Sequence, residues 1–79
     1  MIPDKENLIL TRKRIHHLIH KTAVISSKSI NKIVGAELFF KCENFQKMGA
    51  FKMRGAANAI LQLSETEKNK GVTTHSSGN

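Results

Sequence analysis

The apolar residues of two stretches fall near the spacing of one face of an α-helix, at intervals of about one or two helical turns or as direct neighbours. The first stretch covers residues 7–20, and its apolar positions are Leu8, Ile15, Leu18 and Ile19. The second covers residues 51–63, and its apolar positions are Met53, Ala56, Ala57, Ile60 and Leu63. Polar and basic residues fill most of the other positions, so the pattern predicts two amphipathic helices.

A shorter helix is expected over residues 27–34. Ser27 can accept a hydrogen bond from its first turn, and Gly35 can adopt the left-handed conformation that commonly ends a helix. Residues 22–25, just before it, are partly β-branched and too few for more than an extended connection. Residues 64–71 begin with acidic side chains and close at a glycine, which is typical of a loop or a short connecting helix.

In residues 36–42 the side chains Leu38, Phe40 and Cys42 alternate with Phe39 and Lys41. This alternation predicts a strand with at least one buried face. A second strand is expected at residues 72–74, while the polar residues 43–50 form a connection. The resulting order of helix, strand, helix, strand favours an α/β fold with a parallel sheet and a right-handed crossover. Ligands of such folds usually bind at the carboxyl ends of the strands.

The chain is strongly basic, with 13 Lys and Arg against 6 Asp and Glu, for a formal net charge of +7. This charge fits an anionic partner, and a small basic nucleic-acid-binding module is one alternative reading. The basic residues are nevertheless spread thinly outside 12–14, and stacking aromatics are scarce, with no Trp or Tyr. We therefore expect no nucleic-acid partner. We also expect no metal site, because His16 and His20 lack a nearby acidic or cysteine ligand.

One cysteine cannot form an internal disulfide, and no apolar run approaches the length of a membrane span. These features indicate a cytoplasmic protein without membrane contact, in which Cys42 is a buried thiol. With 79 residues the core can only be small. The chain also stops directly after a polar turn, so we interpret it as the N-terminal piece of a larger α/β protein.

Lys52 is the first candidate for chemistry, in the run "KMGAFKMRGA". It falls in the first turn of the helix expected over 51–63. The positive end of the helix dipole, together with partial burial, would disfavour its charged form and favour a nucleophilic amine. An ordinary solvated lysine remains the alternative from the residues alone.

Two separated motifs, "FFKCENFQKMGAFKMRGAANAI" and "THSSGN", resemble the N-terminal region of the serine racemase and serine/threonine dehydratase family. The similarity extends over about residues 20–79. These are fold type II enzymes, related to the β subunit of tryptophan synthase, with three layers around a mostly parallel sheet, and they depend on pyridoxal 5'-phosphate. The resemblance implies that residues 1–79 are one piece of the catalytic domain, with no second domain.

By this resemblance, Lys52 links covalently to the cofactor aldehyde and later takes the α-proton of the substrate. Asn79 would hydrogen-bond the hydroxyl oxygen of the cofactor ring. Ser76, Ser77 and Gly78 would receive the substrate carboxylate, and in racemases the counterpart of Ser77 is the second acid/base. No other residue type supplies both of the functions assigned to the lysine.

Two further groups of residues follow from the same family. Phe51 would lie beside the cofactor, although core packing is its plainer role, and Arg54 is expected to form a structural ion pair. Eukaryotic serine racemases bind an activating nucleotide at the positions of Ser27, Lys28, Ser29, Lys47 and Met48. Three of these residues, Lys28, Ser29 and Met48, differ from the family pattern.

The function implied by the family is dehydration and deamination of L-threonine or L-serine to a 2-oxo acid and ammonia. Serine racemase and 3-hydroxyaspartate ammonia-lyase are the alternatives within the family. We expect a small amino acid as the substrate and a homo-oligomer, a dimer or tetramer, at full length. The isolated 79 residues should be inactive, because the glycine-rich phosphate loop of the family and its partner for the pyridine nitrogen are not among them.

Overall fold

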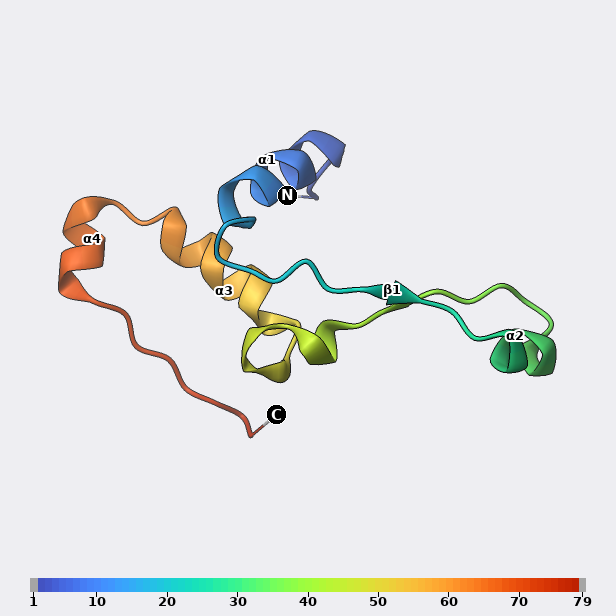
Figure 1. Ribbon diagram of the computed structural model, residues 1–79. Coiled ribbons are helices and arrows are strands. Elements are labelled where there is room, and N and C mark those ends of the chain that lie inside the picture. Colours follow the sequence, from blue (N-terminus) through green and yellow to red (C-terminus); the bar gives the residue numbers. More distant parts are fainter. Residues whose placement is uncertain (1, 79) are drawn as a thin grey trace.

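The computed structural model describes residues 2–78, which form short helices joined by extended segments (Figure 1). Their Cα radius of gyration is 16.6 Å, and their extents are 54 × 32 × 25 Å. A compact domain of this length would have a radius of gyration of about 12 Å. The elements are therefore spread out along the chain and bury little of one another.

Within residues 2–78, six regular elements and two 3₁₀ turns follow one another. The helices are α1 (Lys5–Ile15), α2 (Lys28–Val34), α3 (Lys52–Leu61) and α4 (Glu65–Lys70), and the strands are β1 (Val24–Ile25) and β2 (Phe40–Lys41). The 3₁₀ turns, η1 (Glu43–Phe45) and η2 (Lys47–Gly49), fill the connection between β2 and α3. Within residues 2–78, no helix is both long and apolar enough to cross a membrane.

Side-chain caps fix the starts of three helices. The Asp4 carboxylate accepts from the Asn7 amide at 2.8 Å, and the Asn7 side chain accepts from the Asp4 amide at 2.9 Å. This reciprocal pair starts α1 at Lys5, and the helix ends at Ile15. The predicted bounds of 7–20 were therefore wrong at both ends. Ser64 starts α4 with the same arrangement.

Helix α2 follows its predicted bounds closely. Ser27 accepts from the Ile30 amide at 3.3 Å, and Gly35 ends the helix with φ of 69°. This positive φ is open to glycine at little cost and strains most other residues. The predicted stop at Gly35 is confirmed.

The two strands pair in an antiparallel sense, with Val24 opposite Lys41 and Ile25 opposite Phe40. This pair was not predicted, because residues 22–25 were expected to form only an extended connection, and α2 lies in the segment that joins the two strands. The strand expected over 36–42 shrinks to two residues, since only these find a partner on β1. Residues 72–74 are extended without a paired strand in the described part of the chain, so the second predicted strand is also not formed there.

The small core lies where α1 packs against α3 (Figure 1). Ile15 of α1 and Ala57 of α3 are buried, and the Arg14 guanidinium donates to the Asn58 side-chain oxygen at 2.6 Å across the same interface. Cys42 is buried after β2, which confirms the predicted buried thiol. Two polar residues are also buried, Thr22 and Gln46, and both belong to the network that surrounds the start of α3.

Candidate functional site

Lys52 lies in the first turn of α3, as predicted, and is its first residue, since the helix covers residues 52–61 where 51–63 was expected. Its side chain is exposed, so the expected partial burial was wrong: the described elements do not pack over this end of the helix. Within residues 2–78, no hydrogen bond or ion pair engages its amine. The amine is thus available at the end of a helix whose free amides favour negative charge nearby.

The chain reaches α3 through a tight reversal in η2. Met48 and Gly49 both have positive φ, 63° and 68°, and the Gly49 amide donates to the Gln46 carbonyl at 2.8 Å. Methionine in this left-handed conformation is uncommon. Two consecutive left-handed residues turn the backbone sharply, and α3 begins three residues later with Lys52.

An ion pair connects α3 back to η1. The Arg54 guanidinium donates to both carboxylate oxygens of Glu43, from Nε at 2.8 Å and from Nη2 at 2.7 Å. The Thr22 hydroxyl donates to the same carboxylate at 2.6 Å. Hydrogen bonds from Arg54 and Thr22 lower the pKa of Glu43 to about 2, and the pair raises the pKa of Arg54. The predicted structural ion pair of Arg54 is confirmed.

Gln46 supplies a second anchor three residues after Glu43. Its side chain accepts from the His20 amide at 2.8 Å and donates to the His20 carbonyl at 2.9 Å. It also accepts from the Lys47 amide at 3.1 Å. Gln46 is only 3% exposed and pairs with the backbone as a neighbouring strand would.

Sequence reasoning missed the roles of Glu43 and Gln46. Both lie in the stretch 43–50, which was assigned to a polar connection only. The available signal was their position, because polar residues directly after a predicted strand and shortly before a candidate reactive lysine are placed to support that lysine. Their partners Thr22 and His20 are more than twenty residues away in sequence, and no local pattern reveals such pairs.

An open cavity of about 420 Å³ lies between α1, the segment after it and α3. The basic residues Arg12, Lys21, Lys41 and Arg54 line it, together with Ile19 and the two histidines considered above as metal ligands, His16 and His20. Among residues 2–78, no three His, Cys, Asp or Glu side chains lie close enough together to hold a metal ion. The cavity is therefore a basic surface hollow next to the network.

The segment predicted to bind the substrate, residues 76–78, is exposed and has no regular structure. In Figure 1 it belongs to the stretch that follows α4 and runs apart from α3. The Gly78 amide donates to the Ser76 hydroxyl at 3.1 Å, and the φ angle of Gly78 is 92°. In the described part of the chain no hydrogen bond joins Ser77 to Lys52, and the facing arrangement of these two residues stays a prediction. Asn79 lies outside the described residues.

The stretch just before this segment runs closer to α3. Residues 72–74 and the apolar side of α3, including Ala56, Ile60 and Leu63, line a cavity of about 430 Å³. The stretch thus faces α3 across an apolar space.

The residues of the expected nucleotide site fall in two places. Ser27, Lys28 and Ser29 lie at the start of α2, where the Ser27 hydroxyl caps the helix. Lys47 and Met48 lie in η2, and both are exposed. No hydrogen bond joins the two groups among residues 2–78, and nucleotide regulation stays a prediction.

Three comparisons with known proteins bear on this site. The family model described as "Pyridoxal-phosphate dependent enzyme" matches residues 15–79. A serine racemase of Dictyostelium discoideum is 63% identical over 67 residues, 85% of this chain and 21% of the relative. A beta-hydroxyaspartate dehydratase of Paracoccus denitrificans is 50% identical over 78 residues, 99% of this chain and 25% of the relative.

The solved structures that this chain resembles are also serine racemases. The structure of maize serine racemase superposes with a TM-score of 0.90 at 50% sequence identity, and the match covers 99% of this chain and 24% of the maize chain. This chain thus spans about a quarter or less of the length of these relatives.

Proposed function

The chain belongs to the pyridoxal-phosphate dependent enzyme family, and from this premise we propose that the enzyme of which it forms part racemises serine. The predicted cofactor, pyridoxal 5'-phosphate, and the predicted fold class, the N-terminal part of a fold type II enzyme, are both confirmed by the family and the structural match. The proposal of serine racemisation is supported by the serine racemases among the relatives.

The observation that carries the proposal is the position of Lys52 at the start of α3 with its amine exposed. When bound, the cofactor supplies an aldehyde for covalent attachment and an electron sink for negative charge on the substrate α-carbon. The residues present fit this group, because the Lys52 amine is accessible and has no hydrogen bond or ion pair within residues 2–78. Lys52 would hold the cofactor through Nζ and later accept the substrate's α-proton at the same atom.

Ser77 is proposed as the group that returns a proton to the opposite face of the α-carbon. Lys52 and Ser77 on opposite faces would make the overall change an inversion, with one proton removed and one returned. Loss of the β-hydroxyl as water after the first step, followed by hydrolysis of the carbon–nitrogen bond by water, would instead give a 2-oxo acid and ammonia. The partition between the two outcomes decides whether the enzyme is a racemase or an ammonia-lyase.

A second candidate is an ammonia-lyase acting on 3-hydroxyaspartate. It is favoured by the beta-hydroxyaspartate dehydratase at 50% identity and by an L-threo-3-hydroxyaspartate ammonia-lyase of Saccharomyces cerevisiae at 43% identity. Dehydration of threonine was the main prediction from the sequence, and these relatives do not specifically support it. They favour the two alternatives. All of them are named as enzymes, which also favours catalysis over a basic nucleic-acid-binding module.

The test is a substrate assay on the full-length enzyme loaded with the cofactor. L-Serine, L-threonine and L-threo-3-hydroxyaspartate are supplied separately, and D-serine, 2-oxo acid and ammonia are measured. We expect D-serine from L-serine, and Ser77→Ala should lower racemisation by about 100-fold or more while lyase turnover falls less. Faster turnover of L-threonine than of the other two substrates, without D-serine, would contradict the proposal. We also propose that the full-length enzyme is a homo-oligomer, and sedimentation of the same preparation would measure its mass. Its proposed location is the cytoplasm.

A further inference from the structure

The first turn of α3 is weakly fixed by its own hydrogen bonds. Phe51 precedes the helix and provides no side-chain cap, and the Arg54 amide reaches the Phe51 carbonyl at a long 3.4 Å. An uncapped first turn frays readily. Another contact must therefore hold the turn that carries Lys52 in one position.

Glu43 makes that contact. Its carboxylate receives two parallel hydrogen bonds from Arg54, which is two residues after Lys52 on the same turn. A forked pair of this kind fixes orientation as well as distance. The Glu43 side chain is 18% exposed and the Arg54 side chain is 35% exposed, so the pair is partly shielded from water.

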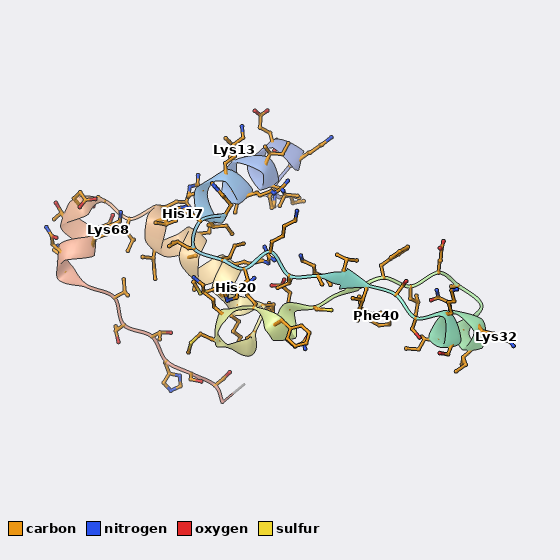
Figure 2. All side chains as sticks on the ribbon, in the orientation of Figure 1. Lys13, His17, His20, Lys32, Phe40 and Lys68 are labelled. Atoms are coloured by element: carbon orange, nitrogen blue, oxygen red, sulfur yellow. The ribbon has the colours of Figure 1, made fainter. Side chains whose placement is uncertain are left out.

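Glu43 is itself held from the other side. The buried Thr22 donates its hydroxyl to the carboxylate, and the Lys41 ammonium donates to the Thr22 carbonyl at 2.7 Å. Gln46, three residues later, is tied to both backbone groups of His20. Figure 2 labels His20 on the segment that passes beside the 3₁₀ turns. The stretch 43–46 is thus anchored to the segment 20–22 at both of its ends.

The geometry points to Glu43 as a positioning residue for Lys52: through Arg54 it holds the first turn of α3 so that the lysine amine meets the cofactor in one orientation. This inference rests on the proposed function. Glu43 makes no hydrogen bond to Lys52 in the described residues, so it acts only through Arg54 and the helix backbone. A displacement of about 1 Å at a reacting atom can cost roughly 100-fold in rate.

The test measures how fast the cofactor becomes attached to Lys52 in the full-length enzyme. Cofactor-free enzyme is mixed with pyridoxal phosphate, samples are reduced with borohydride at set times, and the label on Lys52 is quantified by peptide mass. Glu43→Gln keeps the size of the side chain and removes its charge. The matched control is Glu65→Gln, because Glu65 is 87% exposed and forms only a 3.5 Å ion pair with Lys68 on α4.

We expect Glu43→Gln to slow attachment by about 10- to 100-fold and to lower kcat with little change in KM, while the control stays within about twofold of wild type. A merely structural role would lower the unfolding temperature and leave the attachment rate of the folded enzyme unchanged. Unchanged attachment in folded Glu43→Gln overturns the inference.

Thr22→Val is a second variant, in case Glu43→Gln does not fold. It removes only the hydroxyl that donates to Glu43 and keeps nearly the same shape. A smaller but measurable slowing of attachment supports the inference, and a wild-type rate overturns it. The wild-type sample tests the proposed function separately, because that function fails if wild-type Lys52 carries no label. If wild type is labelled on Lys52 and both variants are labelled at the wild-type rate, only the role of Glu43 is refuted.

Discussion

Gln46 is the residue whose removal has the most direct structural consequence. Its side chain makes three hydrogen bonds to backbone groups, two to His20 and one to the Lys47 amide, and it is 3% exposed. Gln46→Ala removes all three. Each is worth about 1 kcal/mol net, and because His20 is exposed, water can replace part of the loss. The expected cost is about 2–3 kcal/mol.

Hydrogen exchange of the full-length enzyme measures this cost locally. The His20 amide is protected by Gln46, so a peptide that contains it should exchange roughly 30- to 140-fold faster in Gln46→Ala, the factor that corresponds to 2–3 kcal/mol. Gln46→Glu is the sharper variant. The glutamate keeps an acceptor for the His20 amide but places an ionised oxygen opposite the His20 carbonyl, and these two oxygens repel each other. The His20 amide should therefore lose protection from exchange at neutral pH in this variant as well.

Gln62→Ala is the matched control. Gln62 is an exposed glutamine whose side chain donates only to the Asn58 carbonyl one turn earlier, at 3.0 Å. Its replacement should change stability by no more than about 0.5 kcal/mol. If exchange at His20 stays within about twofold of wild type in Gln46→Ala, or changes equally in the control, the role assigned to Gln46 is wrong.

Three further predictions concern charge and helix ends in the full-length enzyme. The pKa of Glu43 is lowered to about 2, so its ionised form stabilises the fold above its ordinary value of 4.5, and this stabilisation is lost as the pH falls from 4.5 towards 2. Wild type should lose more stability than Glu43→Gln over that range in an acid titration followed by circular dichroism, and equal losses would contradict the pairing. Gly35→Ala should cost about 1–2 kcal/mol in thermal unfolding and Gly35→Asn less, because φ is 69° and no atom crowds the site; equal costs would point to packing instead. Ser64→Ala should cost α4 about 1 kcal/mol and speed exchange of the Glu67 amide, and unchanged exchange there would rule out the cap.

Local rules predicted the parts of the fold that depend on neighbouring residues. Ser27 and Gly35 bound α2 as expected, and Lys52 begins α3, because caps and apolar spacing act over a few residues. The start of α1 was missed although a capping signal was present: Asp4 and Asn7 are three residues apart, and the prediction started from the apolar pattern alone.

Non-local contacts could not be predicted in this way. The antiparallel pairing of Val24 and Ile25 with β2 spans the whole of α2, and residues 22–25 were expected to form only an extended connection. The ion pair of Arg54 was expected, but its partner Glu43 was not, since many acidic residues satisfy the same charge rule. The relation of Ser77 to Lys52 was implied only by the resemblance to a family, and no hydrogen bond joins the two residues within residues 2–78.

Covalent attachment of the cofactor to Lys52 can be measured directly. The full-length enzyme is incubated with pyridoxal phosphate and reduced with borohydride, and the added mass is located by peptide mapping, with Lys70→Arg as a control for surface lysines. We expect a pyridoxyl group on Lys52, retained in Lys70→Arg and absent in Lys52→Ala. A label scattered over other lysines, or none at all, would contradict it.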